Sequence, residues 1–313
     1  MKPEVIMDIL QQKPSVHKLY YGGYIQETLK LKEHIYAVPL KALGFNDESN
    51  YTARYVTEIC GGVVDGKQLD SLIQQGKNAL PVIAIVVLEL NLDTPELMEQ
   101  EAEKALIIPE KIVGWAAGEN LIPFAYITSL PNQHFFRILP PHSRRRQRLG
   151  FGNTGNDYSS QLTRMIDCAE KDEHFLFALS LYKDALAEDN AAFKIARFFS
   201  CLESLAYKLK SREVPSRKAV KQLLGLKDGA FVQQNIDGKE YKYDKIEISG
   251  RLRDKLFHGI PFKEKDLNTE SKHVFELLKN NPELIANSLR DDCELEFARW
   301  SNKASNGLTE VQV

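Results

Sequence analysis

Residues Ile248–Gly259 read ISGRLRDKLFHG and set two arginines and a histidine near the end of a predicted helix. Each residue of an α-helix advances by about 100°, so Arg251 and His258 lie almost on one line. Arg253 is offset by about 140° from His258, but its long side chain can reach the imidazole if Gly259 ends the helix in a left-handed cap. A permanent cation that suits phosphate would then lie beside an imidazole, which exchanges protons near neutral pH. This pair suits phosphodiester chemistry without a metal.

Helical spacing extends outward from this stretch through the C-terminal half of the chain. Apolar residues recur three and four apart, as in Leu176, Leu179 and Tyr182. The sequence predicts helices over 162–170, 175–187, 191–210, 216–224, 245–258, 269–279 and 282–300, with a small hairpin near Asn235–Gly238. We expect a helical bundle over 157–302 and a polar, disordered tail over 303–313.

Alternating patterns and turn residues dominate the other half of the chain. The predicted strands are short segments within 17–43, then 56–64, 81–92, 112–116, 124–128 and 134–139. Thr94 as N-cap and Pro95 at the first helical position predict one helix, running to about Leu106. Pro140-Pro141 stops the last strand and a charged, turn-rich segment follows. The sequence therefore predicts an α+β chain, with a mixed N-terminal domain over 1–150 and helices beyond it.

Arg253, Asp254 and His258 resemble the signature of the HEPN superfamily, which is an arginine, usually a polar residue, and a histidine after four to six intervening positions. Arg251 with His258 fits the longer spacing, and Asp254 stands where the family more often has asparagine. The segment 191–205, AAFKIARFFSCLESL, resembles the HEPN helix that ends in an acidic residue facing the motif, here Glu203. A strand-containing N-terminal region joined to such helices is similar to ApeA-like and MauJ-like HEPN proteins.

The resemblance implies a metal-independent endoribonuclease in which the ribose 2′-OH attacks the adjacent phosphate. His258 would act as general acid or base, Arg253 would hold the phosphate, and Arg251 is a second candidate for that role. The resemblance also implies a homodimer with two facing motifs, and a toxin or phage-defence effector. Two alternatives remain open: a non-catalytic RNA- or nucleotide-binding module, and an accessory protein of the MauJ-like type.

Each site residue also has a simpler interpretation. His258 can be a helix-terminal histidine that interacts with the helix dipole. Glu203 lies among apolar residues of its helix, and a buried carboxylate needs a cationic partner, for which Arg251 and Arg253 are the candidates. The alternative is an exposed acid paired with Lys208 or another surface base.

A basic run follows the predicted domain boundary. Arg144, Arg145, Arg146 and Arg148 are candidate RNA-binding residues, because phosphate contacts by arginine need no particular base sequence; a solvated interdomain linker is the alternative. The glycines of 150–155 match the spacing of a dinucleotide-binding loop, but arginines stand where a strand should precede them. We therefore predict no cofactor.

Composition limits the remaining classes of function. The net charge of −2 excludes a globally basic nucleic-acid-binding surface, so RNA would need a local patch. The four cysteines are far apart in the sequence and no zinc-ligand spacing occurs, so we assign no metal and expect a reducing cytoplasm. Residues 1–13 lack the apolar core of a signal peptide. The apolar run 79–90 is interrupted by Pro81 and Glu89 and is too short to span a membrane.

Overall fold

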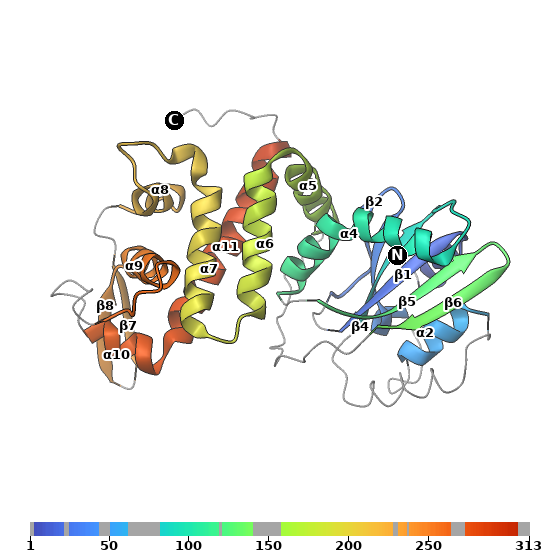
Figure 1. The fold of residues 1–313 in the computed structure, drawn as a ribbon, viewed down its shortest axis with the longest axis horizontal. Helices are drawn as coiled ribbons and strands as arrows, with labels where there is room; N and C mark the ends of the chain where they lie inside the picture. The colour runs from blue at the N-terminus through green and yellow to red at the C-terminus, as the bar shows by residue number, and fades with distance from the viewer. Residues whose placement is uncertain are drawn as a thin grey trace. The chain divides into compact units, whose positions relative to one another are not determined.

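The structure is a computed structural model, and it describes residues 3–21, 25–43, 51–61, 82–118, 121–139, 158–227, 231–236, 238–263 and 273–305. Contacts divide the chain into two units between Asp167 and Cys168, within helix α5 (Tyr158–Lys171). The N-terminal unit contains a sheet and the C-terminal unit is mainly helical (Figure 1). The predicted α+β class is confirmed.

The N-terminal unit is built on a six-stranded antiparallel sheet with the strand order β2-β3-β4-β1-β5-β6. Its described elements are α1 (Pro3–Leu10), β1 (Ser15–Tyr21), β2 (Leu29–Lys32), β3 (Ile35–Pro39), the 3-10 turn η1 (Leu40–Leu43), α2 (Tyr51–Ile59), β4 (Val82–Leu88), α4 (Pro95–Ala117), β5 (Ile122–Leu130) and β6 (Gln133–Ile138). The central strand β1 pairs with β4 and β5. The next strand in the chain, β2, therefore lies at the edge of the sheet, beyond β4 and β3.

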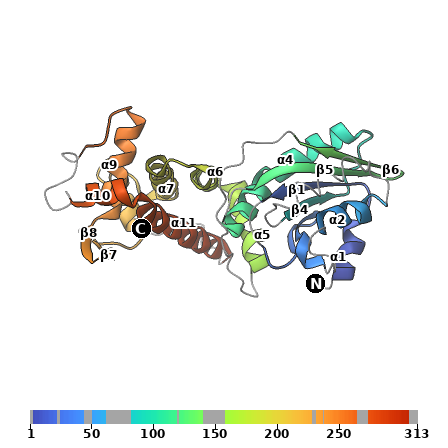
Figure 2. The same cartoon turned by 90° about the horizontal axis from the view of Figure 1, so that it is seen from below.

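Side chains of β1 alternate between the two faces of the sheet, as the pleat requires. Leu19 joins an apolar core with residues of α1 and α2, whereas the flanking Lys18 and Tyr20 bond to carboxylates of α4. Figure 2 shows α4 on one side of the sheet and α1 and α2 on the other. Helices therefore cover both faces of the sheet.

His17 is the buried polar centre of the α2 face. Its Nδ1 lies 2.6 Å from the hydroxyl of Tyr55 on α2, and its Nε2 lies 3.0 Å from Oγ of Ser15. Burial, and to a smaller extent the imidazole of His134, lower the pKa of His17 from 6.5 to about 3. The ring is therefore held neutral in the folded protein.

Two strand predictions in this unit are wrong. Residues of the predicted strand 56–64 belong to α2 up to Ile59, and Tyr55, Val56 and Ile59 bury one face of that helix. The predicted strand 112–116 is the last part of α4, which begins at the predicted cap Thr94 but runs past Leu106 to Ala117. The α1 helix was not anticipated. Strands β4, β5 and β6 lie where they were predicted.

The C-terminal unit confirms the predicted run of helices. Its elements are α5 from Cys168 onward, α6 (Glu173–Ala187), α7 (Ala191–Leu205), the 3-10 turn η2 (Tyr207–Leu209), α8 (Ser216–Leu223), β7 (Val232–Ile236), β8 (Lys239–Tyr243), α9 (Lys245–Phe257), α10 (His273–Asn280) and α11 (Pro282–Ser305). Strands β7 and β8 form the small hairpin predicted near residues 235–238. Helix α11 continues to Ser305, and the rest of the predicted tail lies outside the described residues.

Helix α7 is the central helix of this unit and packs against α6, α9 and α11. Rings fill the core: Phe297 of α11 meets Phe175 and Tyr182 of α6 edge-on, with centroids 5.4 and 5.7 Å away. Phe198 and Phe199 of α7 are fully buried. Because α7 packs against three other helices, its side chains that face α9 have defined positions.

Candidate functional site

Helix α9 begins and ends at residues whose local chemistry fixes its limits. The side chain of Asp244 accepts bonds from the backbone N–H groups of Ile246 and Glu247, which caps the N-terminus. At the other end His258 is the C-cap residue and Gly259 has φ 65°. The N–H of Ile260 then bonds to the carbonyl of Lys255, as in a Schellman motif. The predicted positions of His258 and of the left-handed glycine are confirmed.

Arg253 contacts the acidic residue of α7, as the sequence predicted. One terminal guanidinium nitrogen lies 2.9 Å from Oε2 of Glu203, and the other lies 3.3 Å from Oδ1 of Asp254. The side chains of Arg253 and Glu203 are 19% and 18% exposed. The guanidinium carbon also lies 5.3 Å from the ring centre of Phe199, a cation–π distance. Arg253 is therefore a largely buried cation whose guanidinium is held by two carboxylates and an aromatic ring.

The second oxygen of Glu203 has its own cationic partner. Nζ of Lys210 lies 3.2 Å from Oε1 of Glu203. Lys208, the partner that the simpler interpretation suggested, pairs with Asp172 instead. Glu203 thus bridges the motif arginine and a lysine that the sequence did not single out.

Arg251, the other candidate arginine, is not brought to Glu203. Its Nε lies 2.7 Å from Oε1 of Glu247, one turn earlier on α9. Of the two candidates, Arg253 is the one that contacts α7, and Arg251 belongs to a neighbouring cluster.

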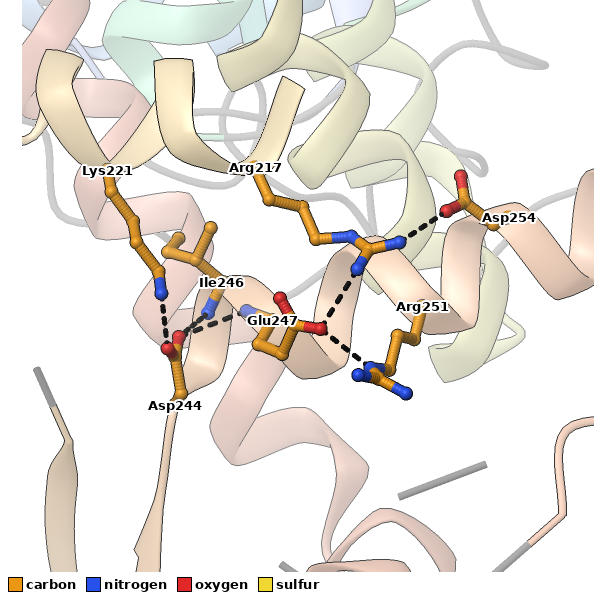
Figure 3. Close-up of polar contacts among 7 residues, drawn as sticks. All are labelled: Arg217, Lys221, Asp244, Ile246, Glu247, Arg251 and Asp254. Atoms are coloured by element: carbon orange, nitrogen blue, oxygen red, sulfur yellow. Dashed lines mark hydrogen bonds and ion pairs between the residues drawn. The ribbon is translucent and has the colours of Figure 1, made fainter. Parts of the chain in front are cut away.

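Figure 3 shows this cluster, in which Arg217 of α8 spans two turns of α9. One nitrogen of its guanidinium lies 2.9 Å from Oε1 of Glu247, and the other lies 2.8 Å from Oδ2 of Asp254. Gly250 makes room for this crossing, since a Cβ at that position would lie 2.8 Å from the Cγ, Cδ and Nε atoms of Arg217. Asp254 therefore joins Arg217 to Arg253.

Sequence reasoning missed Arg217 and Lys210, which lie far from the motif in the chain. One signal was present. Gly250 stands in a helix interior, where glycine is unfavourable by about 1 kcal/mol relative to alanine, and such a glycine often marks the close approach of another group.

The charges around Arg253 leave a positive balance. The ion pairs link four cations, Lys210, Arg217, Arg251 and Arg253, to three carboxylates, Glu203, Glu247 and Asp254. Each carboxylate is shared between two cations. An anion that approaches these cations therefore meets no carboxylate that lacks a cationic partner.

His258 is exposed, and no ion pair or hydrogen bond of its ring occurs among the described residues. The exposed side chains of Phe257 and Ile260 lie beside it in the sequence. An imidazole in this position is open to a substrate that approaches the end of α9. It can give or take a proton there.

The other predicted sites are placed as follows. Arg144, Arg145, Arg146 and Arg148 lie outside the described residues, as does the glycine segment 150–155. Within the described ranges, no three His, Cys, Asp or Glu side chains gather in an arrangement that could hold a metal ion. No described helix is long and apolar enough to cross a membrane.

The chain was compared with models of protein families, with curated proteins and with solved structures, and none of the three comparisons found a match.

Proposed function

We propose that the C-terminal unit is a HEPN-type, metal-independent endoribonuclease whose reactive group is His258. The observation that carries this proposal is the 2.9 Å pair between Arg253 of α9 and Glu203 of α7, on the helix that ends at an exposed His258. Two sequence segments that resemble the family separately thus meet in space at the residues that the resemblance names.

In the proposed reaction Arg253 binds the scissile phosphate through the terminal nitrogens of its guanidinium. Glu203 and Asp254 fix the plane of that group, so it needs little reordering when phosphate arrives. A bidentate guanidinium suits the charge that develops on the phosphate oxygens.

His258 exchanges the proton in the same scheme. It takes the proton of the ribose 2′-OH as that oxygen attacks the adjacent phosphate, or it gives a proton to the departing 5′-oxygen. The products are a 2′,3′-cyclic phosphate and a 5′-hydroxyl. We also propose a homodimer in which two such motifs face one another, with toxin or phage-defence activity as the biological setting.

A second candidate function is a non-catalytic RNA- or nucleotide-binding module. Arg253 already has two carboxylate partners, and this observation favours the binding module. The two carboxylates weaken the attraction between the guanidinium and the phosphate in the transition state. In that case the positive balance around Arg253 still attracts the backbone of RNA, but His258 performs no chemistry. An accessory protein of the MauJ-like type would neither bind nor cleave RNA.

Incubation of the purified protein with an RNA oligonucleotide in EDTA tests the proposal. A matched oligonucleotide with 2′-O-methyl groups is the control, because it binds similarly and lacks the attacking hydroxyl. We expect cleavage of the first, with cyclic phosphate ends, and none of the second. Binding of both without cleavage would favour the module, and neither binding nor cleavage would favour the accessory protein.

A further inference from the structure

The N-terminal unit contains a cleft of about 780 Å³ on the α4 face of its sheet. It lies between the first turns of α4 and strands β5 and β6, and Lys18 of β1 also lines it. A volume in this range accommodates a small organic molecule. The cleft is independent of the residues in the proposed ribonuclease site.

The floor of the cleft is a row of three residues that face each other across neighbouring strands. Lys18 of β1 is opposite Tyr126 of β5, which is opposite Arg137 of β6. Both cations lie near the Tyr126 ring, with Nζ of Lys18 5.6 Å and Cζ of Arg137 5.1 Å from its centre. Residues opposite one another in antiparallel strands share a face, so this row is built by the register of the sheet.

Carboxylates of α4 neutralise both of these cations. Nζ of Lys18 lies 2.8 Å from Glu103 and 2.7 Å from Glu110, and the lysine side chain is only 5% exposed. Arg137 pairs with Glu99, which also accepts a bond from the hydroxyl of Thr128. An anionic ligand would have to compete with these carboxylates for each cation.

Negative charge is therefore in excess at the cleft. Glu96, on the rim, has no ion-pair partner among the described residues. With Glu99 and Glu103 it makes three carboxylates in the lining against the two cations of the floor, and Glu110, which is not part of the lining, also pairs with Lys18. Spacings of three, four and seven place Glu96, Glu99 and Glu103 on one face of α4, above the row.

The remaining walls are apolar and partly uncovered. Phe135 of β6 lines the cleft and is 38% exposed, whereas alternation along β6 directs the neighbouring Phe136 to the apolar core on the opposite face of the sheet. Rings of Pro95 and Pro123 and the side chain of Leu139 complete the lining. Flat apolar walls suit a ring or a short hydrocarbon, and the surplus carboxylates suit a positive charge attached to it.

We propose that this cleft binds a small organic cation, an ammonium group carried on a flat apolar body. The ammonium would lie against the carboxylates of Glu96 and Glu103, and the apolar body would lie against Phe135. The sheet row and the acidic face of α4 together form the site.

Calorimetric titration of the full chain with tryptamine tests the proposal, and indole-3-acetate, with the same ring and the opposite charge, is the matched probe. We expect tryptamine to bind with a Kd in the millimolar range or tighter, and indole-3-acetate to bind at least about tenfold more weakly. Stronger binding of indole-3-acetate would overturn the proposal, as would no heat from tryptamine at about 10 mM.

Two variants separate a charge effect from damage to the fold. Arg137→Gln removes a cation of the floor and should tighten tryptamine binding by about twofold to fivefold. Glu96→Gln removes a rim carboxylate and should weaken binding by a similar factor. General damage to the cleft cannot produce opposite changes, so equal weakening by both variants would contradict the assigned charge preference.

Discussion

The protonation of His17 should make the N-terminal unit unfold more easily in acid. Its folded pKa of about 3 lies below the ordinary value of 6.5, so the unfolded chain binds a proton first as the pH falls. The stability that depends on a neutral ring is complete above pH 6.5 and is lost progressively down to about pH 3. At about 1.4 kcal/mol per pH unit, the interval from 6.5 to 5 lowers the free energy of unfolding by about 2 kcal/mol.

The assay uses the two tryptophans of the chain, one in each unit. In a Trp300→Phe background, fluorescence of the buried Trp115 reports urea unfolding of the N-terminal unit at pH 8 and pH 5. His17→Asn in the same background removes the titrating ring and retains a short polar side chain. We expect the parent to lose about 2 kcal/mol more than His17→Asn between the two pH values. Equal losses in both proteins would refute the reasoning.

Two further predictions concern the C-terminal unit and use urea unfolding followed by circular dichroism. Glu203→Gln should lower the free energy of unfolding by about 1–2 kcal/mol, because a largely buried guanidinium loses a charged partner, whereas Glu213→Gln on the surface should change little; equal effects would contradict the assigned pair. Gly250→Ala should destabilise the parent, because its Cβ displaces Arg217, but should stabilise an Arg217→Ala protein by about 0.5–1 kcal/mol. Stabilisation in both backgrounds would show that the contact between position 250 and Arg217 does not affect the free energy of unfolding.

Local patterns predicted strands β4, β5 and β6 and the start of α4 at Thr94, but they missed helices α1 and α2. They failed for 112–116 because Ile112, Val113 and Trp115 are all buried, and a short run that is apolar throughout does not distinguish strand from helix. Pro109 was a further obstacle, since proline inside a helix is unfavourable. The strand prediction for 56–64 followed β-branched residues, whereas packing of Val56 and Ile59 against the sheet decides for a helix.

The candidate site was predicted in part. A glycine after His258 predicted the end of α9, and an acid on an apolar helix predicted the contact of Glu203 with an arginine. Arg217 could not be found in the same way, because its contact with Asp254 depends on how α8 crosses α9. The cleft of the N-terminal unit depends on strand register and was likewise beyond local patterns.

The most direct test of the central claim is the rate of RNA cleavage by His258→Ala in EDTA. His34→Ala, which removes another partly exposed histidine in the N-terminal unit, is the matched control. Loss of a positioned acid or base lowers rates by about 100-fold to 10,000-fold, so His258→Ala should be slower by at least about 100-fold with an unchanged circular dichroism spectrum. His34→Ala should cleave at the parent rate. Cleavage by His258→Ala as fast as by the parent would contradict the assignment of this histidine as the reactive group.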